Sequence, residues 1–388
     1  MANSSDFFQT FPDRTGTNSV KWDACRAEHG ADALPMWVAD MDVTSASAIR
    51  DALLRRAEHP VYGYTIVSDA DREALIGYWQ RRHGVRFAAE DILPLPCVVT
   101  GLKACVRALT EPGDGVILQG PVYGPFRQSV ELNGRAVLDA ELRRDENGRY
   151  SMDLEAIERF FREGAKLMLL CNPYNPVSRA WSAEELQALL DVLNRYGVPL
   201  VSDEIHADFV FAPKKHVSAL SLQRERVVML CAPSKTYNVA GLQNASAVSG
   251  DARILQALRE ETEASGVVSG NIFGLEAARA AYTEGDAWLD ALMAHLAANR
   301  DGLAREVERQ IPKAILTPIE ATYLAWLDLR AYGYNDAELA RRTEQAGVIF
   351  TGGAFFGRQG DGFLRVNFGF PTAHVTEAVA RLKKALEA

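Results

Sequence analysis

The chain contains 388 residues, of which 48% are hydrophobic and 24% charged, a composition typical of a globular protein with two domains or one large domain and a satellite. Its formal net charge of −9 at pH 7 argues against nucleic acid as the main partner, since phosphate binding needs a basic face. The sequence has no run of 18 apolar residues, and its first eight residues lack the pattern of a secretory signal. We therefore expect a cytoplasmic protein.

The cysteines favour reduced thiols in the core. They are odd in number, scattered and mostly embedded in apolar runs, which does not fit disulfides or a metal site. The five are Cys25, Cys97, Cys105, Cys171 and Cys231.

The first 50 residues predict an irregular segment that ends in Leu34-Pro-Met-Trp-Val-Ala-Asp-Met-Asp42, with Trp37 beside paired carboxylates. This run is either part of a ligand site or a loop that packs the tryptophan on the core, with Asp42 near the start of a helix at residues 46–58. A turn at 61–65 places two tyrosines around a glycine, and an amphipathic helix follows at 69–83. Two tyrosines at a turn are commonly packing residues.

From residue 92 to about 285, short apolar runs alternate with helical patterns. The alternation predicts βα units and an α/β fold, with a mainly parallel sheet and helices on both faces. The expected strands are 97–100, 115–119, 136–140, 166–171, 199–202 and 227–231. The expected helices are 102–109, 153–162 and 183–196.

After residue 285 the pattern predicts a smaller α/β lobe. Its expected elements are a helix at 288–310, a strand at 322–328, a helix at 336–346, a Gly-rich turn at 351–354, a strand at 362–368 and a helix at 375–386. We predict a large domain at 51–285 and a small domain at 286–388, which residues 1–50 join.

Candidate ligand-binding residues follow successive strands of the large sheet. In parallel sheets ligands gather beyond the carboxyl ends of the strands, so these residues should meet at one edge. They are Gly101, Tyr123, Asn175, Asp203 and Lys235.

Three charged residues among the candidates suggest chemistry. Lys235 follows the apolar run 227–231, where an amine can be desolvated enough to act as a nucleophile instead of a surface charge. Asp203 at a buried strand end needs a cationic or N–H partner, which a protonated pyridine nitrogen, a helix cap or a core ion pair would supply. Arg365 in an apolar strand would bind a carboxylate ligand or an internal acid.

The remaining candidates could position a ligand. Gly101 opens a predicted helix whose free N–H groups would attract an anion, and Ser234 could donate to the same group. Asn175 stands between prolines, which would fix its amide direction. Ordinary helix starts and turns share these features.

Seven motifs, in order over more than 300 residues, resemble fold-type I pyridoxal-phosphate enzymes of the aminotransferase class I/II superfamily. Within these enzymes the chain resembles the MalY/PatB branch of cystathionine β-lyase-like proteins. The motifs are Met36-Trp-Val-Ala-Asp-Met-Asp42, Tyr62-Gly-Tyr64, Gly120-Pro-Val-Tyr123, Asp203-Glu-Ile-His206, Gly266-Val-Val-Ser-Gly-Asn271, Thr322-Tyr-Leu-Ala-Trp-Leu-Asp328 and Gly362-Phe-Leu-Arg-Val-Asn367.

The resemblance implies the cofactor pyridoxal 5′-phosphate (PLP), bound covalently by Lys235. Asp203 would keep its pyridine nitrogen protonated, and Asn175 would bond its phenolic oxygen. His206 stands where many relatives outside this branch have a tyrosine, and Tyr123 would stack on the ring.

For the phosphate and the substrate, the resemblance implies a site shared between two subunits of a homodimer. Gly101, Leu102 and Ser234 would hold the phosphate, joined by Tyr64 of the other subunit. Lys235, Tyr123 and Tyr64 would be catalytic. Arg365 would bind the substrate α-carboxylate, with Trp37, Val38, Ala39, Asn175 and Tyr323 on the substrate side.

The implied reaction is β-elimination from cystathionine or another cysteine S-conjugate, which releases a thiol, pyruvate and ammonia. Lys235 would also move the Cα proton. An aminotransferase, a specialised S-conjugate enzyme of a biosynthetic pathway and a regulatory binding protein remain alternatives.

Five positions depart from the branch: Val43, Lys103, Tyr174, Ser178 and Phe370. We expect these positions near the mouth of the site or on its substrate side. Substrate choice should then depend on Trp37, Val43, Tyr174 and Arg365.

Overall fold

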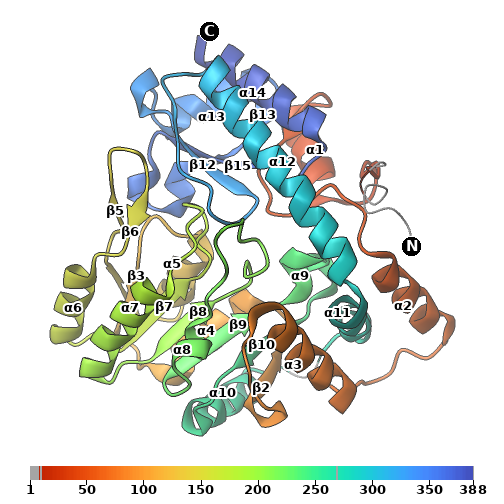
Figure 1. Cartoon of the computed structure of the whole chain (residues 1–388), viewed down its shortest axis with the longest axis vertical. Coiled ribbons are helices and arrows are strands. Elements are labelled where there is room, and N and C mark those ends of the chain that lie inside the picture. Colours follow the sequence, from red (N-terminus) through yellow and green to blue (C-terminus); the bar gives the residue numbers. More distant parts are fainter. Residues whose placement is uncertain (1–7, 9–10, 268–269, 388) are drawn as a thin grey trace.

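The computed structural model describes residues 8, 11–267 and 270–387. Within these residues seven strands form the main sheet, in the order β2-β10-β9-β8-β7-β3-β4 (Figure 1). The strands are β2 (Ile92–Leu95), β3 (Gly115–Leu118), β4 (Ala136–Asp139), β7 (Leu167–Cys171), β8 (Leu200–Asp203), β9 (Val227–Cys231) and β10 (Ala245–Val248). Only β10 among them runs antiparallel to its neighbours, which confirms the predicted mainly parallel sheet.

Helices cover this sheet because its central strands are apolar along their whole length. Every residue of β7 and β9 is buried, as expected for strands covered on both faces. The helices of this part are α3 (Asp69–His83), α4 (Val98–Leu109), α5 (Gly124–Glu131), α6 (Leu154–Arg162), α7 (Ala183–Tyr196), α8 (Ala219–Leu222), α9 (Pro233–Thr236), α10 (Ala252–Ala264) and α11 (Ile272–Glu284). A short hairpin of β5 (Arg143–Arg144) and β6 (Tyr150–Ser151) precedes α6.

Local signals explain where several helices begin and end. Ser182 accepts a hydrogen bond from the Glu185 N–H and so caps α7, while Gly197 ends it with φ +67°. Asn271 caps α11 in the same way. Residues 268 and 269 of the predicted 266–271 motif lie outside the described residues.

The predicted strand at 97–100 is wrong. The strand is β2, and Cys97 is the N-cap of α4, so residues 98–100 form the first helical turn. A short apolar run with β-branched residues fits a buried strand or a buried helix equally well, and periodicity cannot separate the two. Gly101 consequently lies inside the helix, where its N–H bonds to the Cys97 carbonyl at 3.1 Å.

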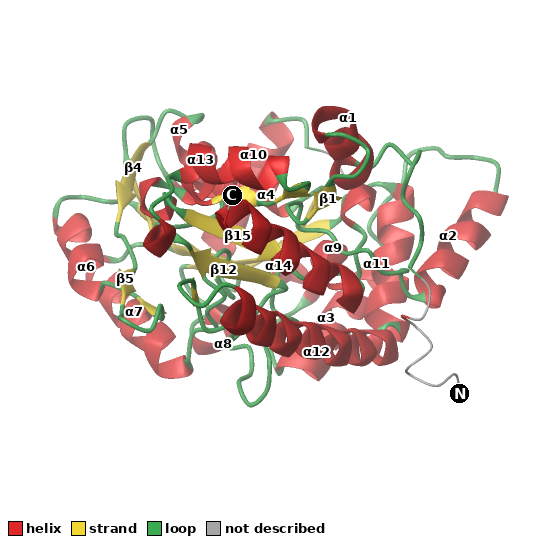
Figure 2. Ribbon diagram, turned by 90° about the horizontal axis from the view of Figure 1, so that it is seen from above, coloured by secondary structure: helices red, strands yellow, loops and turns green. Residues whose placement is uncertain are grey.

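A smaller antiparallel sheet contains four strands in the described part of the chain, in the order β11-β12-β15-β14. They are β11 (Ile315–Leu316), β12 (Leu324–Asp328), β15 (Phe363–Asn367) and β14 (Thr351–Gly352). The neighbouring helices are α12 (Asp286–Gln310), α13 (Asp336–Gln345) and α14 (Thr372–Glu387), and α12 packs along α14 (Figure 2). The predicted smaller α/β lobe has this form.

The N-terminal residues contact both parts. A π-helix (Val20–Ala24) and α1 (Cys25–His29) lead to β1 (Leu34–Pro35), which pairs in parallel with β13 (Val348–Ile349) beside the small sheet. The next helix, α2 (Ser47–Glu58), packs on α11 of the large part. None of the helices in the described residues combines the length and the hydropathy that crossing a membrane requires.

Candidate active site

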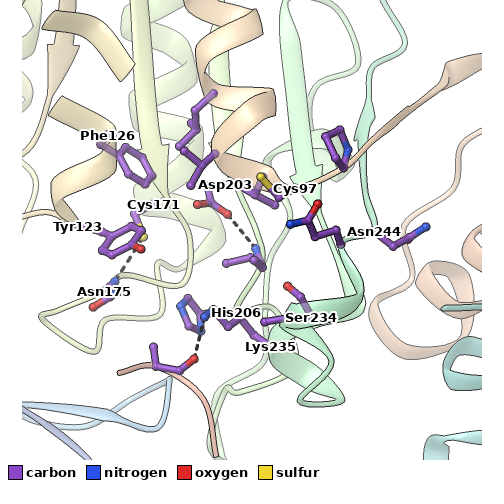
Figure 3. A pocket seen from close by; sticks show the side chains of 18 residues that line it. Cys97, Tyr123, Phe126, Cys171, Asn175, Asp203, His206, Ser234, Lys235 and Asn244 are labelled. Atoms are coloured by element: carbon purple, nitrogen blue, oxygen red, sulfur yellow. Dashed lines mark hydrogen bonds between the residues drawn. The ribbon is translucent and has the colours of Figure 1, made fainter. Parts of the chain in front are cut away.

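One cavity lies at the carboxyl ends of β7, β8 and β9, and with its mouth it encloses about 820 Å³ (Figure 3). The cavity brings together eight of the predicted residues, which come from separate segments. They are Ala39, Leu102, Tyr123, Asn175, Asp203, His206, Ser234 and Lys235. Arg365 and Tyr323 adjoin these residues through hydrogen bonds to Asn175 and Ala39.

Lys235 lies in the short helix α9, directly beyond the buried strand β9. Its Nζ donates to the Ala39 carbonyl oxygen at 2.7 Å. Burial, with a smaller contribution from the Arg365 charge, lowers the pKa of the Lys235 amine to about 8. Near neutral pH an appreciable fraction of this amine is therefore unprotonated, as a nucleophile requires.

Asp203 is the last residue of β8 and is 5% exposed. Its Oδ1 accepts a hydrogen bond from the Ile205 N–H at 3.1 Å, and no lysine or arginine of the described residues pairs with it. Burial raises the pKa of the Asp203 carboxyl to about 7. A buried carboxyl that faces a cavity without a counter-ion fits a cationic ligand atom better than a core ion pair.

Arg365 extends from β15 and is 3% exposed. Its Nη2 donates to the Trp37 carbonyl at 2.7 Å, and its Nη1 donates to Asn175 Oδ1 at 3.3 Å. The guanidinium lies over the Phe356 ring, 5.1 Å from its centroid. Burial lowers the pKa of Arg365 to about 10. Since no acid among the described residues pairs with Arg365, its charge is available to a ligand carboxylate.

The segment 37–42 closes one side of the cavity and is held from the small sheet. Asn367 of β15 donates to the carbonyls of Val38 at 2.6 Å and Asp40 at 2.7 Å, on either side of Ala39. The Ala39 carbonyl thereby remains free to accept from Lys235 and from the Tyr323 hydroxyl, the latter at 2.9 Å.

The large part of the molecule holds the same segment at its other end. Asn238, just after α9, accepts from the Met41 N–H at 2.9 Å and donates to the Met41 carbonyl at 2.7 Å. The side-chain amide of Asn238 therefore satisfies both backbone polar groups of Met41.

A buried charge cluster completes the support of this segment. Lys21, 0% exposed, lies 3.0 Å from Asp42 and 3.4 Å from Asp40, and Arg14 also pairs with both carboxylates. Asp42 is therefore not a helix cap, because the N-cap residue of α2 is Ala46. Sequence reasoning missed the cluster, since a lysine in an irregular segment is ordinarily solvated.

The first turn of α4 lies at one end of the cavity and could bind an anion there. Val98 and Val99 line it, and the N–H groups of a first turn have no partner within the helix. Gly101 does not line the cavity: a methyl group there would lie 2.8 Å from Leu95 Cδ1, so this glycine lets α4 approach the sheet. Sequence reasoning also missed Gln243 and Asn244, which line the same cavity.

Two ring residues flank the centre of the cavity. His206 is buried, its Nδ1 has no partner among the described residues, and burial lowers its pKa to about 3, so its imidazole is neutral. Tyr123, the N-cap residue of α5, presents its ring to the cavity and packs near Phe355 at 5.9 Å between ring centroids.

Tyr64 does not reach the cavity of its own chain. It lies between α2 and α3, where it is fully exposed, and Val61, Tyr62 and Ile66 are exposed beside it. This position leaves open only the predicted role in the site of a second subunit.

The prediction that the departures lie near the mouth of the cavity is wrong for four of them. Val43, Tyr174, Ser178 and Phe370 are at most 4% exposed, and they lie outside the cavity lining. The Tyr174 hydroxyl donates to the carbonyl of Gln119, the residue after β3. Lys103 is half-buried on α4 and does not line the cavity either. These side chains support the core, and no contact with a substrate follows from their positions.

The residues present fit PLP. An amine of depressed pKa, an unpaired buried carboxyl, a planar tyrosine ring and a helix N-terminus lie around one cavity, and each matches a different group of that cofactor. The described residues contain no cluster of three or more metal-binding side chains.

Comparison with known proteins supports this interpretation. The aminotransferase class I and II model matches residues 40–382. The chain is 40% identical to cystathionine beta-lyase PatB of Bacillus subtilis (strain 168), over 98% of this chain and 99% of that protein. It is 33% identical to Protein MalY of Escherichia coli (strain K12), over 98% and 99%. A PLP-bound putative aminotransferase from Clostridium difficile 630 has a similar structure, with a TM-score of 0.95 and 35% identity, over 98% of this chain and 99% of that chain.

Proposed function

Because the chain belongs to the aminotransferase class I and II family, in the branch of PatB and MalY, we propose that it is a PLP-dependent carbon–sulfur β-lyase. Its substrates are L-cystathionine or other L-cysteine S-conjugates, and its products are a thiol, pyruvate and ammonia. The observation that carries the proposal is the placement of Lys235, Asp203 and the Arg365–Asn175 pair around one cavity.

The side chains divide the work as follows. Arg365 and Asn175 bind the α-carboxylate of the substrate and so direct its Cα toward Lys235. Lys235, unprotonated above a pH of about 8, removes the Cα proton. Bound PLP supplies an electron sink for the negative charge that forms at Cα, and the ionised Asp203 carboxylate stabilises positive charge on its pyridine nitrogen. Tyr123 would pack on the ring face, and His206 would lie near the phenolic edge.

Lys235 has a prepared position once its amine is free. The Ala39 carbonyl accepts from Nζ, and the Tyr323 hydroxyl, bonded to the same oxygen, fixes that acceptor. This arrangement keeps the amine inside the cavity and turned away from water. The first turn of α4, with Val98 and Val99, and Ser234 would hold the phosphate. Gly101 drops out of the predicted set, because its N–H bonds to the Cys97 carbonyl.

The proposed assembly is a homodimer in which Tyr64 of one subunit completes the site of the other. Four exposed apolar or aromatic side chains in residues 61–66 support it, because such a patch favours a protein partner. We also propose the domain division at residues 50 and 285, supported by the pairing of β1 with β13. The buried free cysteines fit a cytoplasmic enzyme.

The test uses purified protein with PLP and L-cystathionine or S-ethyl-L-cysteine, in the absence of any keto acid. We expect equal amounts of pyruvate and free thiol. Lys235→Ala should abolish both products and the borohydride-reducible PLP adduct, while Lys215→Ala, at an exposed lysine, should keep them. An adduct that persists in Lys235→Ala would place the reactive amine elsewhere.

A second candidate function is transamination, because the similar structure from Clostridium difficile 630 is described as a putative aminotransferase. The same assay separates the two reactions. Transamination needs an added 2-oxo acid and leaves the C–S bond intact, so keto-acid-dependent turnover without thiol would favour this second function.

A further inference from the structure

We propose that this enzyme selects cysteine S-conjugates whose S-substituent is uncharged and apolar, and that Phe355 is the residue that binds this substituent. The inference rests on the proposed lyase function and specifies its substrate class. It concerns a side chain at the rim of the site that none of the sequence motifs includes.

Phe355 is a large aromatic side chain that is 47% exposed beside the cavity. Its ring centroid lies 5.9 Å from that of Tyr123, which lines the cavity. Gly124, the residue after Tyr123, allows this approach, because a methyl group there would lie 3.1 Å from Phe355 Cζ. The exposed part of this ring, next to the cavity, is an apolar surface that a ligand can cover.

The neighbouring residue connects Phe355 to the carboxylate-binding end. Phe356 is 2% exposed, and its ring lies beneath the Arg365 guanidinium, 5.1 Å from it. Phe356 therefore contacts Arg365, the cation that binds the α-carboxylate, and Phe355 contacts Tyr123 in the wall of the cavity. The Phe355 and Phe356 ring centroids lie 5.1 Å apart, so the substituent of a substrate held by Arg365 would approach the Phe355 ring.

The segment that carries Phe355 is held rigidly. The Val122 N–H donates to the Phe356 carbonyl at 2.9 Å, which joins the segment to the large part of the molecule. Gly353 and Gly360 pack backbone to backbone, so closely that a methyl group on Gly353 would lie 1.8 Å from the Gly360 oxygen. The backbone at Phe355 is therefore held in place beside the site.

The charges around the site disfavour a substrate with a charged distal end. The distal half of cystathionine carries an ammonium and a carboxylate, and both need charged or hydrogen-bonding partners when they leave water. In the cavity lining of the described residues, Asp203 and Lys235 are the only Asp, Glu, Lys or Arg, and the cofactor occupies both.

Two arginines near the rim are already paired. Arg358, in the same segment as Phe355, pairs with Glu141, and Arg127 on α5 pairs with Asp139 at 2.8 Å. A distal zwitterion would compete with Glu141 and Asp139 for these two arginines. An apolar substituent instead removes the exposed Phe355 ring from water, which is favourable in proportion to the area covered.

The test compares kcat/KM for S-benzyl-L-cysteine, S-methyl-L-cysteine and L-cystathionine, measured as thiol release by the holoenzyme. We expect S-benzyl-L-cysteine to exceed L-cystathionine by at least tenfold. Phe355→Ala should lower kcat/KM for S-benzyl-L-cysteine about tenfold, mainly through KM, and leave S-methyl-L-cysteine unchanged. The kcat/KM of Phe355→Leu should fall between those of the parent enzyme and Phe355→Ala. The control Leu132→Ala changes an exposed apolar residue at the C-terminal end of α5 and should match the parent enzyme.

A binding measurement removes turnover from the test. The analogue 2-amino-5-phenylpentanoic acid has a methylene in place of sulfur and cannot eliminate a thiol. Its Kd by calorimetry should rise about tenfold in Phe355→Ala. A preference for L-cystathionine in the parent enzyme, or equal losses for all substrates in Phe355→Ala, would overturn the inference while the lyase function stands. No thiol from any conjugate would overturn the proposed function itself.

Discussion

Lys21 is a buried cation that supports the segment beside Lys235, and its replacement tests how that segment is held. Lys21 is 0% exposed, donates to the Asp40 carbonyl at 3.0 Å and lies 3.6 Å from the Phe370 ring centroid. Burial lowers the pKa of Lys21, so desolvation offsets much of its attraction to Asp40 and Asp42. Most of the folding free energy lost in Lys21→Met therefore comes from Asp40 and Asp42, which are left with less neutralising charge.

Removal of one partner from a buried ion pair costs about 3–5 kcal/mol. Arg14 still pairs with both carboxylates in the variant, so we expect the lower end, about 3 kcal/mol. Urea unfolding of the apo-protein at pH 7 measures this loss. Lys383→Met makes the same change at an exposed pair of 3.8 Å and should cost less than about 1 kcal/mol.

A double variant tests the cause. Asp42→Asn removes the carboxylate that Lys21 neutralises, so Lys21→Met/Asp42→Asn should be more stable than the sum of the two single losses predicts. Additive losses, or a Lys21→Met variant that loses less than about 1 kcal/mol, would refute the charge argument.

Three further predictions concern the cavity itself. Asp203 has a pKa raised from 3.8 to about 7, so its ionisation destabilises the folded apo-protein as pH rises through that range. By calorimetry, apo Asp203→Asn should have a higher Tm than the parent at pH 8 and the same Tm at pH 4. Equal Tm values at pH 8 would contradict the burial effect. The pKa of Lys235 is lowered from 10.5 to about 8, so the rate of PLP uptake by the apo-protein should rise with pH and level off above about pH 8.5. Absorbance follows this uptake. A rate that keeps rising to pH 10 would show that Lys235 has the pKa of an ordinary lysine. Arg365→Lys loses the planar guanidinium, so KM should rise at least tenfold, about 1.4 kcal/mol, with a smaller change in kcat, whereas an unchanged KM would exclude the carboxylate role.

The sequence was sufficient to predict the residues whose neighbours along the chain define their environment. Lys235 and Asp203 each follow a strongly apolar run, and such runs form buried strands whose ends meet at one edge of a parallel sheet. Tyr123 and Asn175 follow from the same rule. The position of β10 could not be predicted, because its four residues have no pattern that separates an antiparallel insertion from a loop.

Contacts between distant segments limited the prediction of the site. Asn367, Asn238 and Lys21 all act on the segment 37–42, and sequence separations of up to about 330 residues hide these contacts from any local pattern. Tyr174 and Val43 are the converse case. Their departure from a motif predicts a substrate contact, but both side chains lie in the core.

The order of chain synthesis gives the doubly held segment 37–42 a further consequence. Residues 34–42 leave the ribosome early in translation. Their hydrogen-bond partners include Ile349, Asn367 and Gly369, which are synthesised near the end. The early segment must therefore wait in a non-native state until the last strand of the small sheet exists. A nascent chain can fold its large sheet beforehand and still lack the wall that faces Lys235, so catalytic competence arises only when synthesis is nearly finished.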